Sequence, residues 1–160
     1  MTGIIYGSSM GNTEAAARII KDKLGDGAEI IDVASVSAKD FERFDMLILG
    51  TSTWGVGDLQ DDWEEKLPEL QKADLSGKKI AFFGLGDQQM YGDSYVDAMG
   101  LLYEAVADSA AVCIGAWPTE GYDFTVSKAV INDKFIGLAL DEDNQSDLTE
   151  SRISEWMEGL

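Results

Sequence analysis

Short apolar runs rich in β-branched residues alternate along the chain with longer segments whose apolar residues recur every three or four positions. The first run, residues 4–6, precedes a helical pattern that starts at Thr13 and stops at Gly25. The same reasoning predicts strands at residues 28–33, 46–49, 80–84 and 112–115, and helices around residues 63–70, 96–106 and 153–157. Pro68 predicts a kink or an early end near Leu67, and Thr149 suits the N-cap of the closing helix.

This alternation predicts one α/β domain over residues 1–160, with a doubly wound, five-stranded parallel sheet covered by helices on both faces. The apolar run at residues 135–140 has the character of a strand, and the polar stretch 118–134 before it predicts an insertion that splits the last strand. Parallel sheets of this kind bind ligands beyond the carboxyl ends of their strands. A site is therefore expected in the loops after the first, third and fourth strands.

The chain is strongly acidic, with 12 lysine and arginine residues against 30 aspartate and glutamate residues, a net charge of −18 and no histidine. Such a charge repels nucleic acid and disfavours anionic membranes. The lack of histidine removes the commonest general base, which lowers the expectation of a hydrolase. Two interpretations of the acidity stay open: steering of a basic protein partner, or solubility alone.

No run of apolar residues is long enough to cross a membrane. The first residues carry no basic segment, so no signal peptide is expected. The single cysteine, Cys113, lies in an apolar run, which favours a buried thiol in a reducing cytoplasm.

The loop after the first strand, residues 8–13, is rich in hydroxyl groups and leads directly into a helix. A helix N-terminus presents free N–H groups and partial positive charge, so a phosphate there could be held by these groups and by hydroxyls. The alternative is a helix simply capped by Asn12 or Thr13. Neither G-x-x-x-x-G-K-[ST] nor G-x-G-x-x-G occurs, which excludes a P-loop and leaves a dinucleotide Rossmann site unsupported.

The loops after the third and fourth strands are glycine-rich, and each carries an aromatic residue, Trp54 and Tyr91. In the expected fold both overhang the same edge of the sheet as the hydroxyl-rich loop. Two aromatic rings beside a phosphate site suit a flat ring with a phosphate tail. For either residue alone, packing on the other ring or on the sheet is the simpler interpretation.

Together these loops resemble the flavodoxin family over essentially the whole chain. Residues 8–13 are similar to the family's phosphate loop, Ser/Thr-x-Thr-Gly-x-Thr, with Met10 in place of the usual threonine. Residues 53–55 match the loop that stacks on one flavin face, and residues 86–88 with Tyr91 match the loop that covers the other. Residues 121–149 resemble the long-chain subgroup, in which an insertion splits the fifth strand.

The resemblance implies the sheet order 2-1-3-4-5 with FMN at the switch between strands one and three. It implies that Asp143 reaches the ribityl chain, and that the peptide at Gly55 turns its carbonyl toward the flavin N5 proton of the one-electron-reduced ring. The cofactor-binding residues expected on these grounds are Ser8, Ser9, Met10, Gly11, Asn12, Thr13, Thr51, Ser52, Thr53, Trp54, Gly55, Leu85, Gly86, Asp87, Tyr91, Asp93 and Asp143. Neither a catalytic residue nor a metal site is expected.

The function so implied is that of a cytoplasmic, monomeric, low-potential carrier of single electrons. Its expected partners are basic redox proteins: a donor similar to ferredoxin/flavodoxin-NADP reductase, and low-potential acceptors such as nitrogenase or radical enzymes. One alternative is a flavin-dependent NAD(P)H oxidoreductase of the same fold, and a flavin store without a redox role also stays open. A phospho-accepting signalling domain is excluded, because the ends of strands one and three lack its acidic residues.

Overall fold

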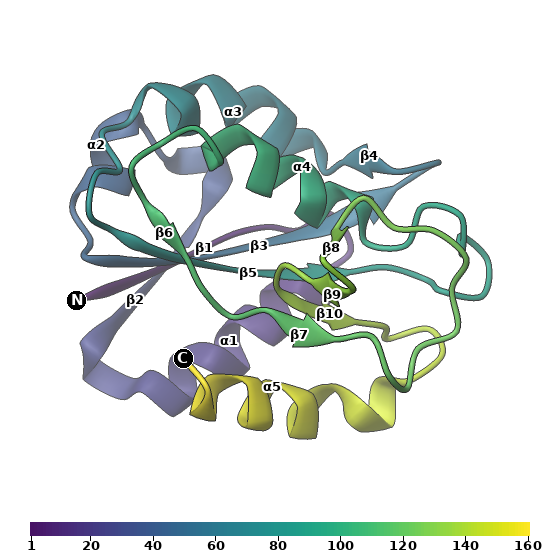
Figure 1. Cartoon of the computed structure of the whole chain (residues 1–160). Helices are drawn as coiled ribbons and strands as arrows, with labels where there is room; N and C mark the ends of the chain where they lie inside the picture. Colours follow the sequence, from purple (N-terminus) through teal and green to yellow (C-terminus); the bar gives the residue numbers. More distant parts are fainter.

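The computed structural model describes all of residues 1–160, which form a central parallel sheet between two layers of helices (Figure 1). The sheet order is β10-β5-β3-β1-β2, and every pair along this path is parallel. Its strands are β1 (Thr2–Gly7), β2 (Ala28–Asp32), β3 (Met46–Trp54), β5 (Lys79–Leu85) and β10 (Leu138–Leu140). In chain order this is 2-1-3-4-5, so the expected doubly wound sheet is confirmed.

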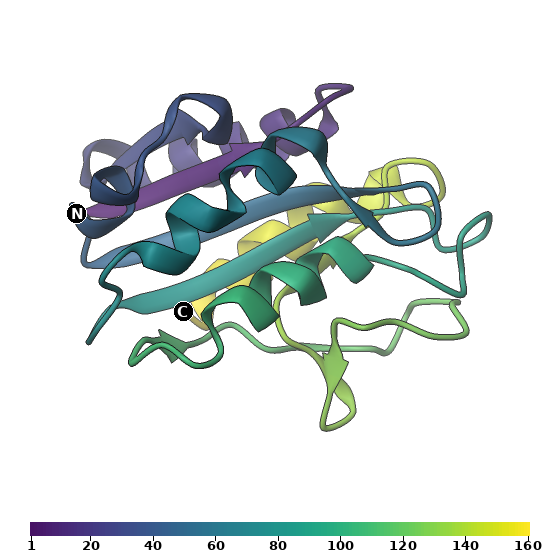
Figure 2. The ribbon, with the colours of Figure 1, turned by 90° about the horizontal axis from the view of Figure 1, so that it is seen from above.

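The last strand position is split between two short strands that both pair with β5. The strand β6 (Val112–Cys113) pairs with the start of β5, and β10 pairs with the end of β5. Between them, β7 (Trp117–Pro118), β9 (Lys134–Phe135) and β8 (Val130–Ile131) form a separate antiparallel sheet. In Figure 2 this insertion follows the outer edge of the main sheet, beyond α4 (Asp97–Val106).

The prediction of one continuous strand over 135–140 is wrong at its start. Phe135 belongs to the small sheet, and pairing with β5 begins only at Leu138. The reason is aromatic packing: the fully buried Phe135 ring lies 5.1 Å from the Tyr122 ring and 5.3 Å from the Phe124 ring, centre to centre. This cluster holds the insertion against the domain.

The helices cover both faces of the sheet, as predicted. On one face lie α2 (Ala38–Glu42), α3 (Asp61–Lys72) and α4, and on the other α1 (Asn12–Leu24) and α5 (Thr149–Glu158) (Figure 1). The short α2 was not predicted, because its five residues show too little of the helical period. A capping box formed by Ser37 and Asp40 marks its start. None of the helices is long and apolar enough to cross a membrane.

Three local predictions need correction. Helix α3 continues through Pro68 to Lys72 rather than ending near Leu67, because burial of Leu70 beyond the proline holds the last turn in place. Thr149 is the first residue of α5 and not its N-cap; its hydroxyl donates to the Glu142 carboxylate. Cys113 is half-buried rather than fully buried, and this burial raises the pKa of its thiol.

Candidate functional site

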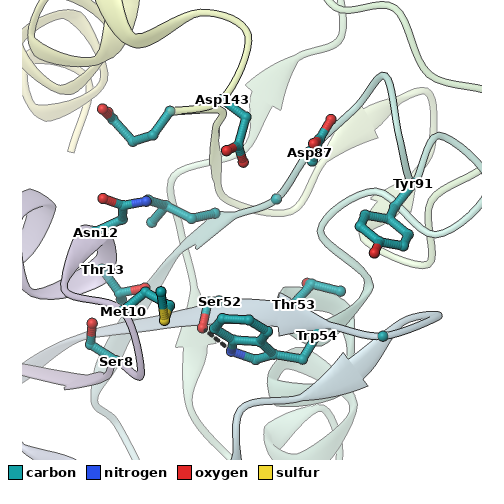
Figure 3. Close-up of a pocket in the computed structure, with 14 residues that line it drawn as sticks. Ser8, Met10, Asn12, Thr13, Ser52, Thr53, Trp54, Asp87, Tyr91 and Asp143 are labelled. Atoms are coloured by element: carbon teal, nitrogen blue, oxygen red, sulfur yellow. Dashed lines mark hydrogen bonds between the residues drawn. The ribbon is translucent and has the colours of Figure 1, made fainter.

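A cavity of about 370 Å³ lies at the carboxyl ends of β1, β3 and β5, where the three predicted loops meet. A fourth segment, which follows β10, closes it (Figure 3). Its lining consists of Ser8, Met10, Asn12, Thr13, Ser52, Thr53, Trp54, Gly55, Leu85, Gly86, Asp87, Tyr91, Glu142 and Asp143. The volume falls in the range of small-molecule sites, about 300–1,000 Å³.

At one end of the cavity the N-terminus of α1 has no side-chain cap. Gly11 precedes it in a left-handed conformation, with φ of 93°, so the interpretation of Asn12 or Thr13 as a simple cap is wrong. The Thr13 hydroxyl is buried and has no hydrogen-bond partner, the only such side-chain atom in the protein. Ser8 Oγ accepts a hydrogen bond from the Gly11 N–H at 3.0 Å, which shapes the loop. A buried donor without a partner, beside free helix amides, is suited to an anion.

Trp54 is the last residue of β3, directly before the tight turn that leads to the short antiparallel strand β4 (Asp58–Leu59). Its indole N–H donates to Ser52 Oγ at 2.8 Å, which fixes the ring beside the cavity, and 39% of the residue is exposed. Gly55 in this turn has φ of +53°, and a Cβ there would lie 2.8 Å from an Asp58 carboxylate oxygen. Thr53 Oγ1 accepts the Ala98 N–H at 3.1 Å and so ties the loop to α4.

Asp87 organises the loop that carries Tyr91. Its Oδ1 accepts the N–H groups of Gln89 and Met90 at 3.1 and 2.9 Å, and the Asn144 amide at 2.8 Å. Burial opposes ionisation of Asp87, but these hydrogen bonds outweigh it and lower its pKa. Tyr91 is 44% exposed, and neither its ring nor that of Trp54 stacks on another aromatic ring of the protein. Both rings therefore remain available to a ligand in the cavity.

The charged side chains that line the cavity are all acidic. No lysine or arginine lines it, whereas Asp87, Glu142 and Asp143 do. Burial raises the pKa of Asp143, and the carboxylates of Asp87, Asp141 and Glu142 raise it further. Glu142 was not predicted as a site residue, although the acidic run directly after the last strand could have indicated it.

Four expected residues lie outside the cavity lining. Thr51 is fully buried and donates its hydroxyl to the Ser52 carbonyl, while Ser9 Oγ accepts from the Gln60 amide at 3.1 Å. Gly11 contributes the turn before α1 rather than a wall, and Asp93 lines a neighbouring depression beside the insertion. The other thirteen expected residues are brought together around one cavity.

The family model described as flavodoxin matches residues 4–156, almost the entire chain.

The chain belongs to the flavodoxin family.

Flavodoxins of two bacteria illustrate the similarity. The chain is 46% identical to flavodoxin of Synechocystis sp. over 157 residues, covering 97% of this chain and 92% of that protein. It is 42% identical to Flavodoxin 1 of Escherichia coli over 162 residues, covering 100% and 92%. Each alignment therefore covers all or nearly all of this chain.

The fold is also that of a solved flavodoxin. The structure of Fusobacterium nucleatum flavodoxin bound to flavin mononucleotide superposes with a TM-score of 0.93 and 34% identity, covering 98% of this chain and 94% of that one. Flavodoxins are electron-transfer proteins and not enzymes, so the expected function class is confirmed by membership in the family.

Proposed function

We propose that the cavity binds FMN non-covalently and that the protein uses it to carry single electrons at low potential between redox proteins. The observation that carries this proposal is the pairing of an uncapped helix N-terminus, holding an unpartnered hydroxyl, with two unstacked aromatic rings in one cavity. FMN combines a phosphate tail with a flat ring, and the flavodoxin of F. nucleatum is similar in fold and was solved with FMN.

The phosphate would be held at the start of α1 without any cationic side chain. The Thr13 hydroxyl supplies a donor that is already desolvated, and Ser8 and the first amides of α1 supply others. Met10 removes the hydroxyl that the family's threonine carries, but its backbone N–H remains. Hydrogen bonds to a charged acceptor are about twice as strong as neutral ones, which favours a phosphate over a neutral group.

The ring would lie between Trp54 and Tyr91, and the chain joining ring to phosphate would pass Asp143 (Figure 3). Bound FMN supplies the redox chemistry, since its ring accepts and releases one electron at a time. The protein contributes the environment that sets the potential. Three carboxylates and no cation line the cavity, so negative charge added there is destabilised, and this favours a strong reductant.

Gly55 is placed to adjust the wall that faces the ring. Its positive φ shows a backbone that a residue with Cβ adopts only with strain, and glycine can turn the peptide over at little cost. We infer that, with FMN bound, the carbonyl of this peptide would be able to accept a hydrogen bond from the ring.

The proposed partners are basic redox proteins, with a reductase that draws on NADPH as donor and low-potential enzymes such as nitrogenase or radical enzymes as acceptors. The loops at this edge of the sheet carry no lysine or arginine: residues 8–13, 51–62, 85–95, 119–127 and 141–149. Their acidic residues would steer a partner with a basic surface to the exposed cavity. The free thiol of Cys113 suits the reducing cytoplasm in which such partners work.

One experiment tests the proposal directly. The purified protein is titrated with FMN, and the absorption spectrum of the complex is recorded during stepwise reduction by dithionite. We expect tight binding with yellow flavin bands, then a blue one-electron-reduced species before full reduction. A protein that stays colourless in excess FMN would refute the proposed function. No feature of the cavity favours the alternative of an NAD(P)H oxidoreductase, and reduction of the complex by NADPH alone would support that alternative.

A further inference from the structure

Gln88 and Asp141 lie behind the cavity rather than in its lining, and both are buried, with 3% and 0% of their surface exposed. Gln88 follows Asp87 in the loop that carries Tyr91, and Asp141 directly precedes the acidic wall of Glu142 and Asp143. A buried carboxylate is costly unless hydrogen bonds replace its water. The contacts of Asp141 therefore show what its charge is used for.

The buried charge of the Asp141 carboxylate is compensated entirely by N–H donors from the two walls of the cavity. From one wall, the backbone N–H and the side-chain amide of Gln88 donate to Oδ2 at 3.0 and 2.8 Å. From the other, the N–H groups of Asp143 and Asn144 donate to Oδ1 at 3.1 and 3.0 Å, and the Asn144 amide donates to Oδ2 at 2.9 Å. No lysine or arginine forms an ion pair with it.

Gln88 extends this network to the insertion. Its side-chain oxygen accepts the Asp123 N–H at 2.6 Å, and its amide also donates to the Gln145 side chain at 2.8 Å. Gln145 in turn donates to the Gly121 carbonyl at 2.9 Å and accepts from Arg152 at 2.8 Å. One buried glutamine thus connects the Tyr91 loop, the segment after β10 and the insertion.

We propose that Gln88 and Asp141 are positioning residues that set the separation of the two cavity walls, and that through Asp123 they couple the insertion to the cofactor. This inference rests on the proposed function, because the walls would position FMN. Neither residue would touch the cofactor. Their effect is to keep Asp87, Tyr91 and Asp143 in place before FMN arrives, so that binding orders little of the protein.

The test uses the FMN complex of the full chain in two separate variants. Gln88→Met keeps the length of the side chain but removes its polar group. Asp141→Asn keeps the shape but replaces one acceptor by a donor. The matched control is Lys78→Met at the opposite end of the sheet, where the ammonium donates to the carbonyls of Glu42 and Phe44 at 2.8 and 2.6 Å. FMN release is followed by the recovery of flavin fluorescence, and hydrogen exchange is followed in residues 121–125.

We expect both site variants to release FMN at least about tenfold faster, the effect of about 1.4 kcal/mol, with an altered visible circular dichroism of the bound flavin. FMN should slow exchange at 121–125 in the wild type and not in Gln88→Met. The control should lose stability toward urea while its release rate and dichroism stay unchanged.

Three results would overturn the proposal, and they differ in meaning. If the wild type binds FMN and both site variants release it at the wild-type rate, the network has only a structural role. The same follows if FMN still slows exchange at 121–125 in Gln88→Met. A wild type that binds no FMN would overturn the proposed function, and this inference with it.

Discussion

Replacing Thr13 by valine removes the one buried side-chain hydroxyl that lacks a partner, while keeping nearly the same shape. Thr13 is 1% exposed, so in the free protein the hydroxyl has lost its water without gaining a hydrogen bond. Leaving such a group unpaired costs about 1–3 kcal/mol. The free protein should therefore become more stable by up to about this amount in the Thr13→Val variant, an unusual direction for a substitution at a buried site.

The FMN complex should respond in the opposite sense. A hydrogen bond to a charged group contributes about 1.5–3 kcal/mol, so its loss should raise the dissociation constant for FMN by roughly 10- to 150-fold. Riboflavin lacks the phosphate, and its affinity should be unchanged within about twofold, since a few tenths of a kcal/mol is the ordinary effect of a substitution away from a contact. Thr13→Ser keeps the hydroxyl and serves as the control, with FMN affinity close to that of the wild type.

Two measurements check this prediction: urea unfolding of the flavin-free protein, and titration with FMN and with riboflavin, followed by the quenching of flavin fluorescence. The reasoning would be refuted if Thr13→Val binds FMN as tightly as the wild type. It would also be refuted if FMN and riboflavin lose affinity equally, because the hydroxyl would then act on the ring or on the fold rather than on the phosphate.

Three further predictions follow from the same structure. Gly55→Val should narrow the gap between the two one-electron potentials of bound FMN in a redox titration. The reason is that valine at a φ of +53° strains the backbone by about 1–3 kcal/mol and hinders the peptide from turning. An unchanged gap would contradict this. Burial raises the pKa of Asp97, so the ionised carboxylate destabilises the folded state above that pKa. Asp97→Asn should therefore stabilise the protein toward urea at pH 7. The gain should vanish below about pH 3.9, the pKa of aspartate in the unfolded chain. A gain that is equal at both pH values would show that ionisation is not the cause. Reduction by a basic reductase should slow as salt is added, because charges are screened within about 8–10 Å at 0.1–0.15 M; a rate independent of salt would argue against electrostatic steering.

The main strands and the positions of the three site loops could be predicted because their signals are local. A strand such as β3, covered on both faces, reads as a continuous apolar run, and the loop at residues 8–13 is visible as a break between two such patterns. The family resemblance then supplied the sheet order and the cofactor, which periodicity alone does not contain. Helix α2 escaped prediction because five residues show too little of the helical period.

Other features depended on contacts between distant residues. Pro68 signals a helix end locally, yet the turn beyond it is kept by the burial of Leu70. Phe135 resembles a residue of the last strand, but its ring packs with Tyr122 and Phe124 and draws it into another sheet. Glu142 was missed as a wall of the cavity because an acidic run after a strand is usually a solvated surface.

The sequence by itself determined the alternation of strands and helices, the negative charge and the chemical character of each loop, because these are properties of neighbouring residues. Only the tertiary structure decided that Thr13 has a desolvated hydroxyl, that Trp54 and Tyr91 border one cavity, and that Asp141 is surrounded by N–H donors. Burial and hydrogen-bond partners are set by which segments meet in space, and those segments lie more than fifty residues apart in the case of Gln88 and Asp141.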